Sequence, residues 1–237
     1  MNTQFKVTLV AAALAAFAST SAMANEEHHE HGPQWVTASA LAVDLQAITN
    51  NFICNFYLPN TATIGGDTAS YASGNIGMNI SAGDTNVQDN AAALASVDSS
   101  FVFGSSSSMV GVGQLSSGNT TSNVGVQNRA RVGDNAFSHA SGNIGVNVAA
   151  GTGNGQKNTI AASVTSLGNV SASILSAQAS GGNMIRNEGC NENTASIGGS
   201  AFSGASGNIG VNITSGTGNL QSNSLSMAVS CTGCTGK

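Results

Sequence analysis

The sequence predicts an all-β protein built from stacked layers, and three observations support this. A unit of about 35 residues occurs three times along the chain. Within each unit Asn and Gln recur at every second position, which is the side-chain period of a β-strand. Only 7% of the 237 residues are charged and only two are proline, so little opposes strand pairing. We expect a β-solenoid or Greek-key-like stack of cross-β layers, one layer per repeat, with flexible linkers.

The composition argues against several classes of protein. The chain has six Lys and Arg against eleven Asp and Glu, a formal net charge of −5. Six scattered cations cannot form a phosphate-binding surface, so we predict no nucleic-acid partner. No apolar run of about 20 residues follows the N-terminus, which argues against several membrane spans. Backbone pairing and stacked polar side chains are the expected sources of stability.

The first 24 residues have the pattern of a secretory signal. Lys6 precedes an apolar run over 7–18, and small residues lead to Ala22-Met-Ala24. This order of charge, apolar run and small-residue cleavage site is typical of a signal peptide. A transmembrane anchor would need a longer span. We therefore predict that 1–24 is a signal peptide and that the mature chain is secreted.

The N-terminal segment 25–59 has two parts. Its start is rich in histidine and glutamate, a composition that can bind zinc, nickel or copper, although a solvated tail is the simpler interpretation. The weak metal candidates are His28, His29 and His31. The stretch from Trp35 to Leu58 is more apolar. It could form a helix that covers one end of the stack, or an additional strand.

Three sequence blocks define each repeat unit. Asn60-Thr-Ala-Thr-Ile-Gly opens the first unit, Ser73-Gly-Asn-Ile-Gly-Met-Asn-Ile follows, and Gly83-x-x-Asn-x-Gln-x-Asn closes it. The same blocks return without gaps in the other two units. We assign the repeats to 60–94, 128–162 and 193–227, dissimilar linkers to 95–127 and 163–192, and a tail to 228–237.

The closing block distinguishes two strand faces. Its amides alternate with variable residues, and one variable position holds Asp89, Lys157 and Ser222 in the three copies. A charge that changes sign between copies is expected to face solvent, which places the amides inside. Buried amides need hydrogen-bond partners, and the same amide one layer away, about 4.8 Å distant, provides one.

The middle block is nearly unchanged on both of its faces, so we expect it to be covered on both. Asn and Gly alternate on one face, and Ile, Val or Met on the other. The predicted structural ladder combines the amides of the middle and closing blocks: Asn75, Asn79, Asn86, Gln88, Asn90, Asn143, Asn147, Asn154, Gln156, Asn158, Asn208, Asn212, Asn219, Gln221 and Asn223.

No catalytic arrangement is evident in the sequence. His139 aligns with Tyr71 and Gly204, so we place it on an outward surface rather than in a catalytic pair. The Gly-Asn-Ile-Gly-Val-Asn block is not followed by the Lys of a phosphate-binding loop. We predict that the protein is not an enzyme and uses no cofactor.

Four cysteines are present. Cys231 and Cys234 form a C-x-x-C pair near the C-terminus, a spacing that by itself could be half of a zinc site or a redox pair. Because the neighbouring sequence has no second pair and no thioredoxin-like βαβ pattern, we favour a thiol or disulfide handle, with no essential role and a metal site as the alternatives. Cys54 and Cys190 could pair with each other. Because four cysteines allow three connectivities, the disulfide pattern stays open.

The combined pattern resembles a known family. Three units of Ala-Ser-Gly-Asn-Ile-Gly-Val-Asn type followed by Gly-x-Gly-Asn-x-Gln-x-Asn, a signal peptide and a terminal C-x-x-C resemble the Fap fibrillins, functional amyloid subunits of Pseudomonas and related bacteria. The resemblance covers about 60–234. It implies an extracellular amyloid fibre that supports biofilm formation and adhesion of a Gram-negative cell. It also implies an outer-membrane export pore, a periplasmic chaperone and a related nucleator subunit.

Two questions follow from that resemblance. Repeat pattern does not separate the major fibre subunit from the minor nucleating one, and we favour the major subunit. The alternative to a structural fibre subunit is a binding protein, a monomeric β-solenoid adhesin at the cell surface. Such an adhesin needs polar caps, whereas the last repeat runs almost directly into the C-terminal tail and leaves an edge that can template another chain. Self-assembly is therefore the favoured interpretation.

Overall fold

The computed structural model describes residues 35–97, 103–166 and 168–230. Fifteen β-strands make up the regular structure of these residues. None of the described residues belongs to a helix that is long and apolar enough to cross a membrane. The all-β architecture predicted from the sequence is thus confirmed.

The strands form three successive layers of five. Layer one contains β1 (Trp35–Thr49), β2 (Phe52–Phe56), β3 (Pro59–Ile64), β4 (Ser73–Ala82) and β5 (Val87–Val97). Layer two contains β6 (Phe103–Ser117), β7 (Thr120–Val124), β8 (Gln127–Val132), β9 (Ser141–Thr152) and β10 (Gly155–Thr165). Layer three contains β11 (Gly168–Gly181), β12 (Met184–Glu188), β13 (Glu192–Ile197), β14 (Ser206–Thr217) and β15 (Leu220–Ser230).

Each strand pairs with its counterparts in the neighbouring layers. The result is five three-stranded parallel sheets, β1-β6-β11, β2-β7-β12, β3-β8-β13, β4-β9-β14 and β5-β10-β15. The pairing is in register, so that Gln88 lies opposite Gln156 and Gln156 lies opposite Gln221. Because every layer follows the same path, equivalent side chains form columns perpendicular to the strands.

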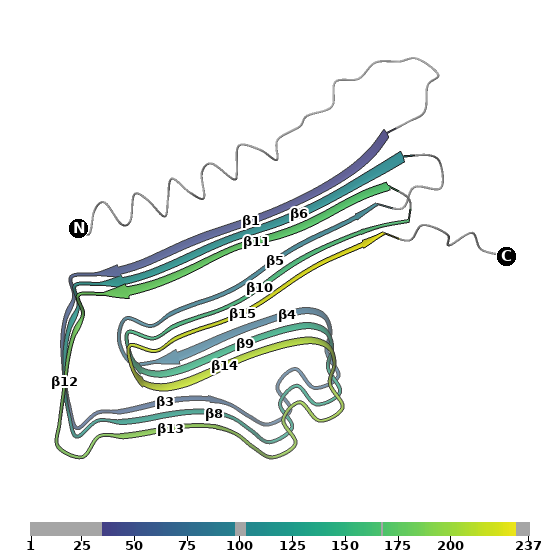
Figure 1. Cartoon of the computed structure of the whole chain (residues 1–237). Coiled ribbons are helices and arrows are strands. Elements are labelled where there is room, and N and C mark those ends of the chain that lie inside the picture. Colours follow the sequence, from purple (N-terminus) through teal and green to yellow (C-terminus); the bar gives the residue numbers. More distant parts are fainter. Residues whose placement is uncertain (1–34, 98–102, 167, 231–237) are drawn as a thin grey trace.

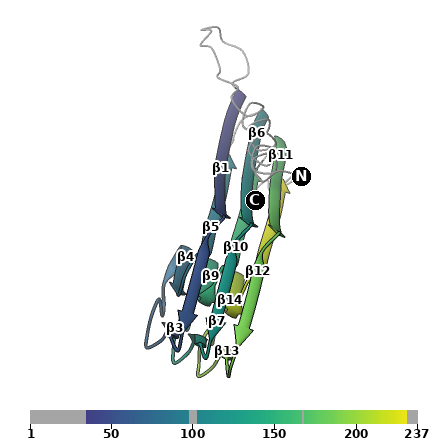
Figure 2. The same ribbon diagram turned by 90° about the vertical axis from the view of Figure 1, so that its left-hand side faces the viewer.

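The five sheets fold over one another within each layer. The β1, β5, β4 and β3 sheets follow one another across the molecule, and the short β2 sheet connects the β1 sheet to the β3 sheet along one side (Figure 1). Viewed after a quarter turn, the three layers lie side by side (Figure 2). The β5 sheet therefore packs between two other sheets.

Two apolar clusters fill the spaces between sheets. The larger one lies between the β3 and β4 sheets and includes the fully buried Val132, Phe137, Ile144 and Val148. Phe137 stacks on Phe202 of layer three at a ring-centroid distance of 5.0 Å. The smaller cluster lies between the β1 and β5 sheets and contains short side chains, among them Ala93, Val110 and Ala161. Their small size allows these sheets to pack closely.

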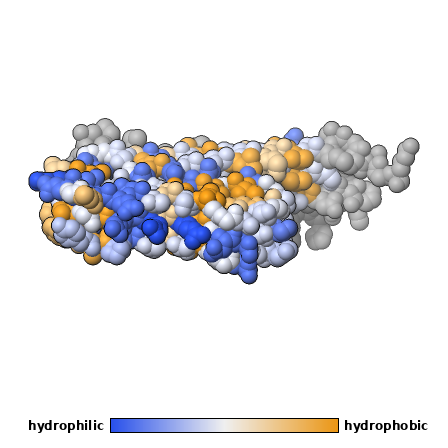
Figure 3. Space-filling view, turned by 90° about the horizontal axis from the view of Figure 1, so that it is seen from below, coloured by the Kyte–Doolittle hydropathy of each residue, from blue (hydrophilic) through white to orange (hydrophobic). Residues whose placement is uncertain are grey.

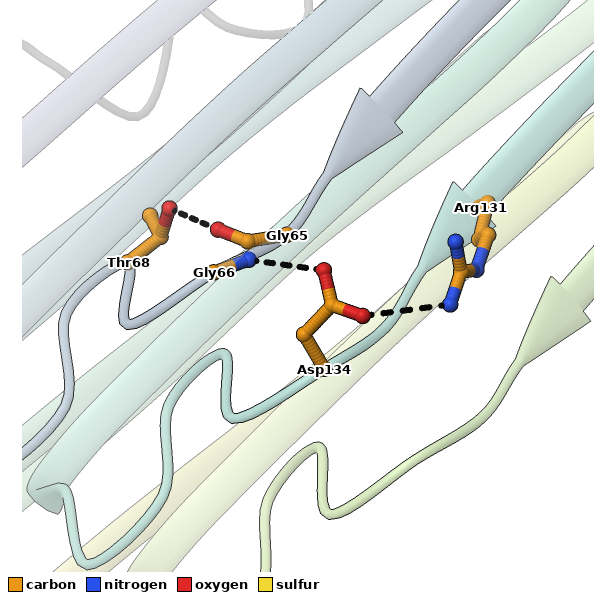
Figure 4. A network of polar contacts seen from close by, with 5 residues as sticks. All are labelled: Gly65, Gly66, Thr68, Arg131 and Asp134. Atoms are coloured by element: carbon orange, nitrogen blue, oxygen red, sulfur yellow. Dashed lines mark hydrogen bonds and ion pairs between the residues drawn. The ribbon is translucent and has the colours of Figure 1, made fainter.

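The turn between the third and fourth strands is also stacked. In layer two, Asp134 accepts a hydrogen bond from the Gly66 amide of layer one at 2.9 Å, and Arg131 lies 3.4 Å from the same carboxylate (Figure 4). The Thr68 hydroxyl donates to the Gly65 carbonyl at 2.6 Å. Backbone bonds such as Phe137 N to Thr68 O, 2.8 Å, continue the layer-to-layer pairing through the turn.

The structure corrects the prediction of flexible linkers. The segment 95–127 contributes to β6 and β7, and 163–192 contributes to β11 and β12, which pair in register with β1 and β2. The stretch from Trp35 to Leu58 forms those first two strands, so the helix alternative is wrong and the additional-strand alternative is confirmed. Each layer therefore consists of a repeat together with the segment that precedes it.

Candidate functional site

The glutamines of the closing block form a continuous ladder through the layers. Gln88 Nε2 donates to Gln156 Oε1 at 2.8 Å, and Gln156 Nε2 donates to Gln221 Oε1 at 2.9 Å. The same nitrogens also donate to carbonyl oxygens of the fourth strand in their own layers, as Gln156 does to Val148 at 3.1 Å. Gln156 has no exposed surface. Its polar atoms thus satisfy the requirement for partners within the stack.

Two asparagine ladders flank the glutamines. Asn154 and Asn219 each donate to the Asn of the preceding layer at 2.9 Å, which links Asn86, Asn154 and Asn219. Asn90, Asn158 and Asn223 are linked in the same way, at 2.9 and 3.0 Å. The first of these ladders lies at the turn into the fifth strand of each layer, and Asn154, just before β10, also donates to the Gly216 carbonyl at 3.0 Å.

A further ladder crosses from the β4 sheet to the β5 sheet. Asn147 donates to Asn79 at 2.8 Å and Asn212 donates to Asn147 at 2.9 Å. Within one layer, Asn158 donates to Asn147 at 3.0 Å, and the equivalent bonds occur in the other two layers. The amides of two neighbouring sheets are therefore one connected network rather than separate columns.

The remaining predicted ladder residues are arranged differently. Asn75, Asn143 and Asn208 are in register, but no hydrogen bond joins their side chains within the described part of the chain. Asn208 lines a small groove of about 240 Å³ at the open end of the β14–β15 pair. Register alone therefore does not make an amide ladder at this position.

Glycines on the inner face of the fourth strand allow the β4 and β5 sheets to approach. A Cβ placed on Gly145 would lie 2.6 Å from Asn90 Oδ1, and one on Gly210 would lie 2.8 Å from Asn158 Oδ1. Gly77 is similarly close to the Asn90 side chain, at 3.2 Å. Because these glycines have no Cβ, the Gly-x-Asn alternation of the middle block leaves room for the asparagine side chains of the β5 sheet.

Sequence reasoning missed four ladders that lie mostly outside the repeats. Their amides donate to one another across layers at 2.7–3.1 Å. The four sets are Gln46, Gln114 and Gln178; Asn51, Asn119 and Asn183; Asn55, Asn123 and Asn187; and Asn60, Asn128 and Asn193. The first three sets share one spacing, Gln-x4-Asn-x3-Asn, in every layer. That spacing was the available signal.

The prediction that Asp89 and Lys157 face solvent is wrong. Their face of the β5 sheet packs against the β1 sheet, and Lys157 is only 1% exposed. Its Nζ donates to the Ala177 carbonyl at 2.9 Å. Burial lowers the pKa of Lys157 to about 8, although the charge of Asp89 opposes this effect. The change of residue between copies at this position therefore occurs on a face that packs against another sheet, and does not indicate a solvated face.

The other candidate residues do not form a reactive site in the described structure. Cys54 and Cys190 are exposed and unpaired. His139 is exposed, as expected, and stacks on Tyr71 with ring centroids 4.9 Å apart. Cys231, Cys234, His28, His29 and His31 lie outside the described residues, as does the predicted signal peptide. No group of three or more metal-ligating side chains occurs among the residues that are described.

The outer layers resemble the inner one but have an open side. Gln88 and Gln221 are only partly buried, whereas Gln156 between them is fully buried. The surface seen from below shows apolar areas between hydrophilic ones (Figure 3). Open strand edges that carry the same amides as the interior are suited to pairing with another chain.

Comparison with known proteins identifies the family of the chain. The model of the functional amyloid protein FapB/FapC family matches residues 39–230. The functional amyloid subunit FapC of Pseudomonas aeruginosa is 42% identical over 194 residues, 79% of this chain and 56% of the relative. The chain thus spans just over half the length of that relative. No solved structure matches the chain. The chain belongs to the functional amyloid protein FapB/FapC family.

Proposed function

We propose that the protein is the structural subunit of an extracellular amyloid fibre, in which layer three of one copy pairs with layer one of the next. The observation that carries this proposal is the continuity of the amide ladders. Gln88, Gln156 and Gln221 repeat one arrangement at successive layers, and both outer members have an open side. Another copy stacked in register would extend every ladder by three layers.

The polarity of the ladders supports head-to-tail stacking. The glutamine ladder donates from layer one towards layer three, whereas the Asn86 and Asn90 ladders donate in the opposite direction. The two ends of the stack consequently present different sets of open donors and acceptors. Layer three fits layer one of a second copy because the second copy simply continues each ladder.

The wider biological role is part of the same proposal. The fibre would stiffen a biofilm and promote surface adhesion, and the chain would reach the surface of a Gram-negative cell after removal of 1–24. An export pore, a chaperone and a nucleator subunit are the expected partners. We assign the chain as the major subunit. A capped adhesin is less well supported, because the apolar stretch that could serve as its cap forms β1 and β2 of layer one.

A charge in the glutamine ladder tests the proposal. Gln88→Lys, Gln156→Lys and Gln221→Lys together would place three like charges in one buried column, about 4.8 Å apart. We expect this variant to form no fibres, as measured by sedimentation and electron microscopy after quiescent incubation.

The matched control adds cations to an exposed column. Thr61→Lys and Thr194→Lys would flank Arg129, which is already solvent-exposed in the same register. This variant also has three cations in a row, but water screens them. We expect it to form fibres. Normal fibres from the glutamine variant would contradict the proposal.

A further inference from the structure

Two acidic side chains meet between the β1 and β5 sheets, in layer one. Asp89 of β5 faces Asp44 of β1, beside the small apolar cluster that joins these sheets. In the same columns, layer two has Lys157 and Val112, and layer three has Ser222 and Ser176. The acidic pair therefore belongs to one outer layer alone.

Asp89 lacks a full set of partners in this position. Its Oδ2 is buried and receives no hydrogen bond from the described residues. Lys157, one layer away, directs its Nζ to the Ala177 carbonyl instead. Asp89 is surrounded by strands β1, β4, β6, β9 and β10. Among the described residues of these strands, the charged ones are Asp44 and Lys157. An ionised Asp89 thus has one cation nearby and one competing anion.

The protonation of Asp89 responds to these surroundings. Burial, together with the charge of the Asp44 carboxyl and a hydrogen bond to it, raises the pKa of Asp89 to about 7, and the charge of Lys157 opposes this shift. Because the pKa in the fold lies above its ordinary value of 3.8, the protonated form stabilises the fold. That contribution is complete below about pH 4 and is lost as the pH rises through about 7.

The open edge of layer one is where the proposed fibre gains its next contact. Layer three of another copy would bring Ser176 and Ser222 over Asp44 and Asp89. Serine hydroxyls supply hydrogen bonds but no positive charge. Docking would therefore remove water from two facing carboxyls without adding a cation, which is costly when both are ionised.

We propose that Asp44 and Asp89 make the junction between copies acid-dependent, so that layer three of one copy docks on layer one of another when this pair holds a proton. The inference rests on the proposed fibre function and adds a condition under which the fibre grows. Growth is fast in mildly acidic surroundings and slow in alkaline ones. The pair acts by controlling the self-association surface and performs no chemical reaction.

Seeded elongation at several pH values tests this inference. The full chain is added to preformed fibres between pH 5.5 and pH 8, and the loss of soluble protein is followed over time. If the protonated pair alone docks, the rate at pH 8 is about one-tenth of the rate at pH 5.5, since about a tenth of the Asp89 carboxyls then hold a proton. Asp89→Asn removes the titrating group with little change in shape, and we expect its rate ratio to be close to one.

The control is Asp84→Asn, which removes an exposed acid from the turn between β4 and β5. It lowers the net negative charge as much as Asp89→Asn does and should retain the tenfold ratio. Elongation of Asp89→Asn with the unchanged parental ratio would contradict the acid-dependent junction while leaving the fibre function intact. Absence of elongation at every pH, in the parent and both variants, would contradict the fibre function and this inference together.

Discussion

At the scale of single residues, the fold depends on amides whose donors and acceptors are both used. Gln156 and Asn147 have no exposed surface, and each is bonded to its counterparts above and below. An unpaired buried amide costs about 1–3 kcal/mol. A ladder avoids this cost in its interior, and the cost falls on its ends. The columns thus favour long stacks over short ones.

The glycines beside these amides give a prediction at the same scale. Gly145→Ala would place a Cβ 2.6 Å from Asn90 Oδ1, so either the β4 and β5 sheets separate or the Asn90 ladder loses its geometry. We expect the soluble concentration in equilibrium with fibres to rise by about tenfold, equivalent to about 1.4 kcal/mol.

Gly198→Ala is the matched control for that substitution. A Cβ on Gly198 meets no heavy atom within 4 Å, and its φ is not in the left-handed region. We expect the soluble concentration of this variant to equal that of the parent. An equal response of the two variants would show that close approach of the sheets does not depend on Gly145.

At the scale of strands, the segments between repeats are part of every layer. Gln114 Nε2 donates to the backbone carbonyl of Gln156 in β10 at 3.1 Å. Gln46 and Gln178 make the corresponding bonds in layers one and three. The β1 sheet is therefore fastened to the β5 sheet by side chains that belong to no repeat unit.

This attachment predicts a loss of stability from changes outside the repeats. Gln46→Ala, Gln114→Ala and Gln178→Ala together would remove a ladder and leave β5, β10 and β15 carbonyls without their donors. We expect fibres of this variant to dissolve at a lower guanidinium concentration than parental fibres, since each lost partner costs about 1–3 kcal/mol.

The control for this prediction lies on the outward face of the same sheet. Ser39→Ala, Ser107→Ala and Ser171→Ala change one in-register column and break no bond that links the sheets. Fibres of the serine variant should match the parent. If both variants matched the parent, the segments between repeats would be passive linkers after all.

The limits of sequence-based prediction also appear at this scale. The repeats were recognisable because β4 is restricted at nearly every position and β5 keeps an amide at every second position of its first part. In β1 and β6, by contrast, outward residues such as Val43 and Gly111 differ freely, and only the spaced amides persist. Asp89 and Lys157 misled for a related reason, because small neighbours from the β1 sheet leave room for side chains that differ between layers.

At the scale of the whole molecule, one chain is a stack of three nearly equivalent layers. The parallel register is continuous from β1 to β11 and from β5 to β15, and the first and last layers differ from the middle one mainly in having an open side. In the proposed fibre, such a subunit would add three layers at each step. The length of the fibre should therefore be proportional to the number of chains, with three layers for each chain.

The mass per length of the fibre tests this central claim most directly. Scanning transmission electron microscopy of unstained fibres measures it, and X-ray diffraction confirms the cross-β spacing of about 4.7 Å on the same sample. A chain of 23.4 kDa, the mass of all 237 residues, that advances three layers predicts about 1.6 kDa per Å for a single filament, and removal of 1–24 lowers this value by about a tenth. A value near 4.9 kDa per Å would mean that each chain occupies one layer, and would contradict the three-layer subunit.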